Sequence, residues 1–129
     1  MKKTIHLFLW VFLVGMALTT ASATGRVSKV TGIYTNMTYN AEGGDVVGTE
    51  VFVVNTNRGY YVVFQSGDGE PSVPVVVPVE VSGSTIRFTL PPGMVGGTFT
   101  GTIDTTQLTG SFSSNHQVIR LKRKASYWQ

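Results

Sequence analysis

Tyrosine and asparagine side chains gather around the first apolar stretch of the chain, and a further tyrosine pair follows downstream. An aromatic ring can stack on a flat or apolar ligand, while a phenol hydroxyl or a carboxamide fixes the orientation of that ligand by hydrogen bonding. This combination predicts a ligand-binding site formed by Tyr34, Asn36, Tyr39 and Tyr60. The alternative is that Tyr60 packs in a core and the other three side chains decorate the surface.

Residues that could support catalysis or bind a metal are sparse. The only histidine beyond residue 23 is His116, which follows Ser113 and Ser114, and a serine and a histidine this close in sequence rarely share one catalytic triad. The acidic stretches 42–45 and 68–70 lack the density of oxygen ligands that calcium requires. The chain has no cysteine, which excludes disulfides and thiolate metal sites. We therefore expect no enzyme, no cofactor and no metal site, with a minimal hydrolase as the least favoured alternative.

Apolar and polar residues alternate along most of the chain. From 73 to 81, for example, a valine occupies every odd position. A period of two is typical of half-buried antiparallel strands, and the breaks between the runs are rich in residues that favour turns. Because the connections are short, successive strands should be antiparallel neighbours in a meander. Eight strands are predicted, at residues 28–39, 46–54, 59–66, 73–81, 84–90, 97–104, 107–113 and 117–123.

Two of these strands nearly mirror each other, since Phe99-Thr-Gly101-Thr-Ile103 is followed by Leu108-Thr-Gly110-Ser-Phe112. An inward glycine lets a strand bend sharply, or lets a bulky side chain cross the interior. A small closed sheet requires strongly coiled strands. The predicted fold is therefore all-β, a small eight-stranded antiparallel meander that closes into a barrel or a partly open barrel.

Prolines weaken one edge of strand 73–81. Residues four apart direct their N–H groups to the same edge of a strand, so Pro74 and Pro78 remove two donors from one edge. The short turn at 82–84 pairs this strand with 84–90, and we expect the intact edge to face that neighbour. The predicted gap in the barrel then lies between 59–66 and 73–81.

The first 23 residues have the features of a secretory signal peptide. Lys2 and Lys3 form a positive n-region, an apolar run extends from 7 to 18, and Ala21-Ser22-Ala23 supplies a small-residue cleavage pattern. Neither this run nor any later stretch reaches the roughly 20 apolar residues that a membrane span needs. We expect cleavage after Ala23, a single β-barrel domain over residues 24–129 without a transmembrane segment, and a secreted or periplasmic location.

Positive charge is concentrated near the end of the chain. Ten lysines and arginines face seven acidic residues, but two of the ten lie in the predicted leader, so the basic balance does not indicate a nucleic-acid partner. Arg120, Lys122, Arg123 and Lys124 predict either a patch for an anionic partner, such as lipid headgroups or acidic glycans, or a charged strand end that protects the sheet edge. We expect the aromatic tail that follows to pack on the barrel, with a membrane interface beside the cations as the alternative.

The predicted meander, with Gly32-Ile33-Tyr34 in its first strand and the two glycine-centred hairpin strands, resembles the small avidin- and lipocalin-like (calycin-type) β-barrels. It is also similar to uncharacterised small secreted bacterial proteins that end in a basic strand and an aromatic tail. The resemblance concerns architecture. Lipocalins carry Gly-x-Trp where this chain has Tyr34, and avidin-like proteins stack biotin on several tryptophans, whereas only Trp128 occurs here beyond residue 23. Biotin binding is therefore not implied.

These features favour a secreted or periplasmic, non-catalytic binding module for a small ligand or an extracytoplasmic protein, for example an inhibitor. The alternative is a structural accessory protein of the cell envelope with a filled interior. A ligand-sized cavity would support the first function, and a packed interior with an exposed apolar patch would support the second.

Overall fold

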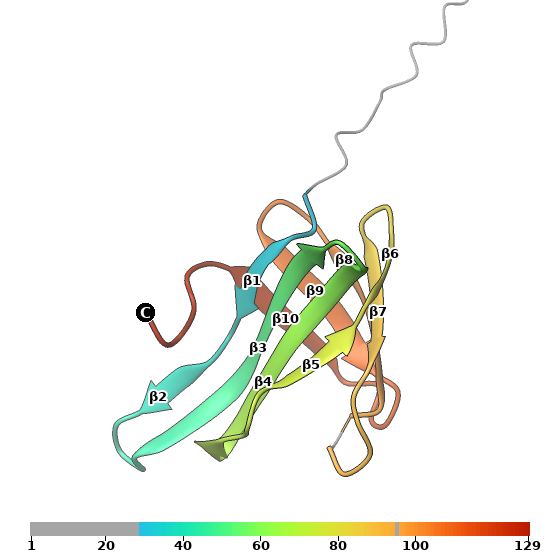
Figure 1. Cartoon of the computed structure of the whole chain (residues 1–129). Helices are drawn as coiled ribbons and strands as arrows, with labels where there is room; N and C mark the ends of the chain where they lie inside the picture. Colours follow the sequence, from blue (N-terminus) through green and yellow to red (C-terminus); the bar gives the residue numbers. More distant parts are fainter. Residues whose placement is uncertain (1–28, 95) are drawn as a thin grey trace, which may run out of the picture.

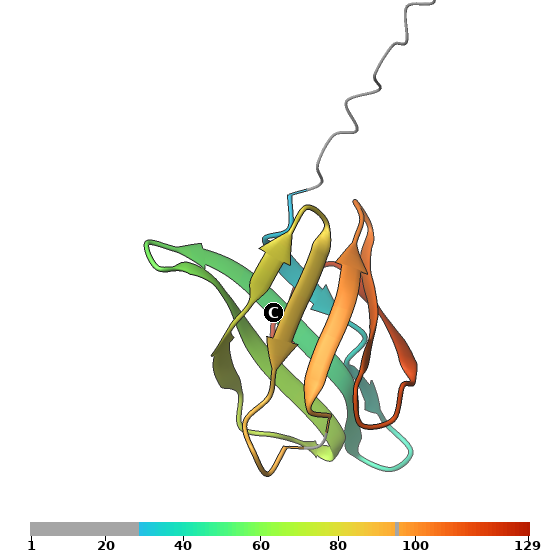
Figure 2. The same ribbon diagram turned by 90° about the vertical axis from the view of Figure 1, so that its right-hand side faces the viewer.

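The computed structural model describes residues 29–94 and 96–129, and the leader predicted at 1–23 lies outside these ranges. The described residues form one antiparallel sheet of ten strand segments, which curls into a nearly closed barrel (Figures 1 and 2). The all-β prediction is therefore confirmed. Within the described part of the chain, no helix has the length and apolar character needed to cross a membrane.

All eight predicted strands are present, and two of them are each broken into a pair of shorter segments. The first predicted strand is divided between β1 and β2, and strand 73–81 is divided between β5 and β6. The order around the barrel is β5-β4-β3-β1-β10-β9-β8-β7-β6, and β2 pairs with the first residues of β3. The segments are β1 (Gly32–Thr35), β2 (Thr38–Asn40), β3 (Asp45–Thr56), β4 (Gly59–Pro71), β5 (Val75–Pro78), β6 (Glu80–Ser82), β7 (Thr85–Thr89), β8 (Thr98–Ile103), β9 (Gln107–Phe112) and β10 (Val118–Arg123).

The barrel closes through the strand that carries the two prolines. β5 pairs with β4, from Tyr61 opposite Pro78 to Phe64 opposite Val75, whereas β6 pairs with β7. Val79, between the two segments, still donates its N–H to the β4 side of the barrel. The chain therefore leaves one neighbour and joins the other within a few residues, and an unpaired seam remains between β5 and β7.

The predicted position of the gap, between 59–66 and 73–81, is wrong because β4 and β5 form a regular ladder there. The N–H of Val79 reaches the carbonyl oxygen of Tyr60 (3.0 Å), so the odd-numbered donors of this strand face β4. The edge depleted by prolines consequently faces β7. The tight turn at 82–84 fixes the pairing of β6 and β7 for three residues only, and the proline-depleted edge then separates from β7.

Apolar side chains fill the barrel interior. Gly101 and Gly110 lie directly opposite each other on β8 and β9, and the ring of Phe99 packs over both of them, as the glycine-centred hairpin predicted. This ring stacks on Phe88 at a centroid distance of 5.0 Å and meets Phe112 edge-on at 5.1 Å. The buried cluster is Val30, Tyr34, Val51, Val53, Val62, Phe64, Val77, Val79, Ile86, Phe88, Leu90, Phe99, Ile103, Leu108 and Leu121.

Arg123 connects the last strand to the segment that precedes β1. Its guanidinium group donates hydrogen bonds to the carbonyl oxygens of Thr31 (3.0 Å) and Lys29 (2.6 Å) and to the hydroxyl of Tyr34 (2.6 Å), and it lies 4.8 Å from the centre of the Tyr34 ring. The Tyr34 hydroxyl in turn donates to the carbonyl oxygen of Val30 (2.8 Å). We call this set of contacts the Arg123 clamp.

The clamp explains why the first strand begins with glycine. A side chain on Gly32 would place its Cβ 2.9 Å from the guanidinium of Arg123, and the backbone φ of +147° at Gly32 is rare for other residues. The clamp therefore depends on Gly32 as well as on Tyr34 and Arg123, and it joins residues about 90 positions apart in the sequence.

The stability of the barrel should fall in alkaline solution. Burial raises the pKa of Tyr34 above its ordinary value of 10.0, although the positive charge of Arg123 opposes part of this effect. The folded state thus favours the neutral phenol, so this contribution to stability is complete below pH 10.0 and is lost as the pH rises through the folded-state pKa. The free energy of unfolding in urea can be measured at neutral pH and again above pH 10.0. The decrease between these two conditions should be larger for the native chain than for Tyr34→Phe. Equal losses in both proteins would contradict this expectation.

Candidate functional site

The outer face of the sheet carries an unexpected row of apolar side chains. Ile33 on β1 lies opposite Phe52 on β3, Phe52 lies opposite Val63 on β4, and Val63 lies opposite Val76 on β5. Phe52 is 38% exposed and Val76 is 64% exposed. The solvent-facing side of an antiparallel sheet is normally polar. A contiguous apolar stripe on that side is typical of an interaction surface, and we call these four residues the apolar row.

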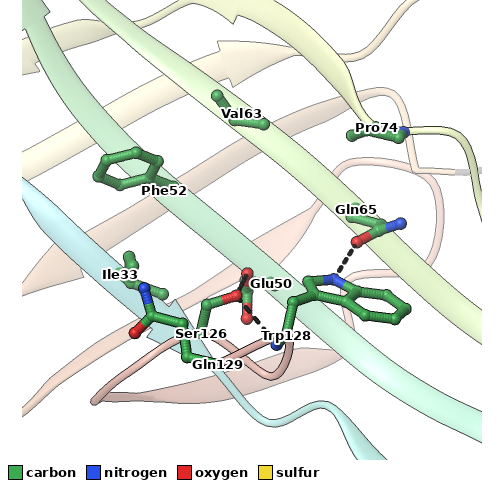
Figure 3. Close-up of a pocket in the computed structure, with 9 residues that line it drawn as sticks. All are labelled: Ile33, Glu50, Phe52, Val63, Gln65, Pro74, Ser126, Trp128 and Gln129. Carbon is green, nitrogen blue, oxygen red and sulfur yellow. Dashed lines mark hydrogen bonds between the residues drawn. The ribbon is translucent and has the colours of Figure 1, made fainter.

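The tail that follows β10 folds over one side of the apolar row (Figure 3). Glu50, a largely buried residue on the outer face of β3, holds this tail in place. Its carboxylate accepts hydrogen bonds from the Ser126 hydroxyl (2.6 Å) and from the Tyr127 N–H (2.8 Å). The Trp128 indole N–H donates to the side-chain oxygen of Gln65 (2.8 Å), so the tail is fixed by its backbone and by its largest side chain.

An outer groove lies between the tail and the apolar row. Its volume is about 410 Å³, and its walls combine aliphatic and aromatic groups with a few polar ones. Pockets of this size accept drug-sized ligands or a large side chain. Trp128 is 56% exposed at one wall, and Phe52 is also partly exposed, so the groove is open to solvent. The lining residues are Ile33, Glu50, Phe52, Val63, Gln65, Pro74, Ser126, Trp128 and Gln129 (Figure 3).

Two polar side chains of the outer groove, Glu50 and Gln65, are already occupied. Both carboxylate oxygens of Glu50 accept bonds from the tail. The amide of Gln65 accepts from Trp128 and donates to the carbonyl oxygen of Ser72 (2.7 Å). A partner therefore finds the carboxylate of Glu50 and the amide of Gln65 already engaged within the chain.

The four residues predicted to bind a ligand do not surround a common pocket. Tyr34 is fully buried within the Arg123 clamp, and Tyr60 packs half-buried against the core. The side-chain oxygen of Asn36 accepts a hydrogen bond from the N–H of Thr49 (2.7 Å), which ties the bend between β1 and β2 to β3. Tyr39 is exposed on β2. None of the four lines the outer groove or the two hollows described next.

Two further hollows mark the open parts of the barrel. One, of about 440 Å³, lies at a barrel end between β4 and the loop after β7, with Phe64, Met94 and Phe112 at its apolar side and Asp68 and several hydroxyl groups at its polar side. The other, of about 260 Å³, follows the seam between β5 and β7. Core side chains fill the interior behind these hollows.

The predicted basic patch is divided by the alternation of β10. Arg120, Lys122 and Lys124 are exposed, whereas Arg123 points inward into the clamp. Lys122 lies opposite Thr35 of β1, and the N–H of Lys124 donates to the carbonyl oxygen of Ile33. Lys122 and Lys124 therefore border the first strand of the apolar row, whereas Arg120 lies further along β10, opposite Thr109 of β9.

Reactive groups do not converge in the described residues. His116 is exposed in a turn with a φ of +55°, and no group of three or more His, Cys, Asp or Glu side chains in residues 29–94 and 96–129 could hold a metal ion. Asp104 has a pKa below its ordinary value because the Thr106 N–H and hydroxyl, and then the Gln107 N–H, donate hydrogen bonds to its carboxylate. That carboxylate caps the turn between β8 and β9.

The fold and the site thus define a nearly closed antiparallel barrel with a packed interior and an apolar groove on its outer face. The chain matches no protein-family model, no curated protein and no solved structure. The resemblance to calycin-type barrels accordingly stays a prediction.

The aromatic tail packs on the barrel as expected, but the sheet residues of the groove were missed by reasoning from sequence, although a weak signal for them exists. Apolar residues at 51, 53 and 54 surround Phe52, so the alternation in this strand is imperfect. Such a break shows that one outward position is apolar. It does not show that Ile33, Val63 and Val76 stand beside it, because that requires the register of four strands.

Proposed function

We propose that this chain is a secreted or periplasmic, non-catalytic attachment module that binds its partner through the outer face of the barrel. The main support for this proposal is the contrast between a packed interior and an exposed apolar row beside an open groove. This proposal keeps the binding function expected from the sequence but moves it from the interior to the outside. It also fits the expected envelope accessory role, for which a filled interior and an exposed apolar patch were the distinguishing features.

The apolar row offers enough surface for a modest, reversible attachment. Fully burying one Phe or Val side chain contributes about 1.5–3 kcal/mol, and Phe52, Val76 and Trp128 all keep large exposed fractions. Aromatic side chains such as these commonly dominate the energetics of interfaces. Phe52 lies at the centre of the row, with Ile33 and Val63 on either side, so it is the residue whose loss should weaken attachment most.

The test is fractionation of the protein in its own host. The native chain should be recovered with the envelope fraction, and Phe52→Asp should move most of it to the soluble extracytoplasmic fraction, because a partner would have to bury an unpaired carboxylate. Val118→Asp is the matched control. Val118 is also an exposed apolar strand residue, 53% accessible, but it lies at the start of β10 outside the apolar row.

The control variant should stay with the envelope. Equal release of Phe52→Asp and Val118→Asp, or retention of both, would contradict attachment through the apolar row. Circular dichroism spectra of both variants should match that of the native chain, because both positions face solvent.

A further inference from the structure

We infer that the partner of this face is an anionic lipid surface, an assignment that rests on the proposed attachment function and names its partner. The observation that carries it is a line of exposed cations placed directly beside the apolar row. Stable binding to a membrane surface from outside generally needs two signals, an apolar insertion and an attraction to anionic headgroups. This face carries both.

The cations and the apolar row share one side of the barrel. Because alternate residues of a strand point to the same face, Arg120, Lys122 and Lys124 extend along the outer face of β10. β10 is paired with β1, and Lys124 bonds through its backbone to Ile33, the first member of the row. The long lysine side chains can therefore reach headgroups while their stems cover the neighbouring apolar surface.

No carboxylate in residues 29–94 and 96–129 forms an ion pair with these cations. Among the residues that the structure describes, the side-chain ion pair found is that of Arg87 with Glu80 on the opposite part of the barrel, at 3.9 Å. Glu50, the acidic residue closest to the row, uses both oxygens to hold the tail. The charge of Lys122 and Lys124 is thus available to an external anion.

The aromatic tail has the character of residues that settle at membrane interfaces. Trp128 exposes more than half of its surface and keeps its indole N–H bonded to Gln65, while its ring meets that of Tyr127 at 4.8 Å. Amphipathic rings of this kind are enriched at the level of lipid headgroups. Phe52 and Val76 lie on the same sheet face and supply the shallow apolar contact.

A lipid surface fits this face better than an acidic protein does. Recognition of a folded partner or a peptide strand uses directional hydrogen bonds, but the groove side chains Glu50 and Gln65 are already satisfied internally. The nearest sheet edge, β5, is depleted of donors by Pro74 and Pro78, so it is a poor template for an added strand. Apart from the side chain of Gln129, this face offers mainly apolar area and positive charge, which suit the non-directional interactions of a lipid surface.

Vesicle binding tests the inference with protein purified from its host. Vesicles of phosphatidylglycerol mixed with phosphatidylcholine should co-sediment the protein, whereas vesicles of phosphatidylcholine alone should bind it far less, and high salt should release it. The emission of Trp128 should shift to shorter wavelength on binding. Each lysine near an anionic surface changes partitioning by about fivefold, so Lys122→Gln with Lys124→Gln should weaken binding by roughly 25-fold.

The matched control removes the same net charge elsewhere. Arg58→Gln with Arg87→Gln alters exposed cations outside β10 and should leave vesicle binding within about twofold, because screening limits their influence at a distance. Equal weakening in both double variants, or equal binding to both kinds of vesicle, would overturn the assignment. If neither kind binds while Phe52→Asp still leaves the envelope fraction, the partner is a protein or glycan and only the lipid assignment fails. If Phe52→Asp has no effect in the host, the attachment function itself fails.

Discussion

Replacing Gly110 by valine is expected to destabilise the barrel by about 3 kcal/mol, the upper end of the cost of overpacking a core. A Cβ at this position would collide with the Phe99 ring, with the carbonyl oxygen of Thr100 and with the backbone of Gly101. Two of these neighbours are backbone atoms of a paired strand, so they cannot rotate away. The measurement is the free energy of unfolding in urea, compared with the native chain.

Gly101→Val should also lower the free energy of unfolding, but by less than Gly110→Val. Its Cβ would lie 2.6 Å from the Phe99 ring and 2.9 Å from the carbonyl oxygen of Thr109, and the ring has some freedom to move. Because both substitutions strain the same side chain, their effects should not add. Phe99→Leu, which narrows that side chain, should recover part of the stability lost in Gly110→Val.

Thr100→Val is the control for the introduction of valine into this hairpin. Thr100 is an exposed residue of β8, and valine suits a strand as well as threonine does. The control should change the free energy of unfolding by less than about 0.5 kcal/mol. If Gly110→Val were equally mild, the glycine pair would be incidental to the packing of Phe99.

The strands could be predicted because their cause is local. The valines at odd positions of 73–81 and the mirrored hairpin around Gly101 and Gly110 fix which side chains face inward, and a period of two requires no knowledge of neighbours. Chain order then predicts most of the strand pairing, because strands joined by short connections usually pair with their neighbours in sequence. The barrel follows from these two facts together.

The position of the seam could not be predicted from local sequence patterns. Pro74 and Pro78 correctly indicated one weak edge, but which neighbour that edge faces depends on where the chain switches partners. The switch occurs at Val79, whose N–H remains with β4. No local pattern marks this point, because it reflects the curvature needed to close the whole sheet.

The candidate site was harder to predict because its parts are distant in sequence. The outer groove needs the register of Ile33, Phe52 and Val63 and the position of a tail that is held by Glu50 some 76 residues away. Nothing in the sequence links Glu50 to that tail. In the same way, the sequence groups Arg123 with three other cations, whereas in the structure the alternation of β10 turns Arg123 inward and leaves its cationic neighbours exposed.

Arg123→Met should be the most damaging change to any of the four clustered cations, with an expected loss of about 3 kcal/mol in the free energy of unfolding. Hydrogen bonds to charged groups contribute about 1.5–3 kcal/mol each. Three acceptors lose a donor, but the exposed carbonyl of Lys29 regains a bond to water and the other two hydrogen bonds are only partly buried, so the loss is smaller than the sum of three bonds. Methionine keeps the apolar stem but leaves the Tyr34 hydroxyl and the carbonyl oxygens of Lys29 and Thr31 without their guanidinium partner. Urea unfolding gives the loss directly. Limited proteolysis near residues 29–31 should also become faster, because the clamp ties this segment to β10.

Two comparisons separate the clamp from a general effect of charge. Arg123→Lys keeps the positive charge but lacks the planar fork that serves three acceptors, so its stability should fall between those of the native chain and Arg123→Met. Lys122→Met removes an exposed cation from the adjacent position of β10 and should change stability by less than about 0.5 kcal/mol. A loss in Lys122→Met as large as that in Arg123→Met would mean that the charge of the strand, and not the joining of its first and last segments, stabilises the barrel. The clamp geometry argues for the second cause, because the guanidinium reaches residues 89 to 94 positions away and so ties residues 29–34 to the last strand.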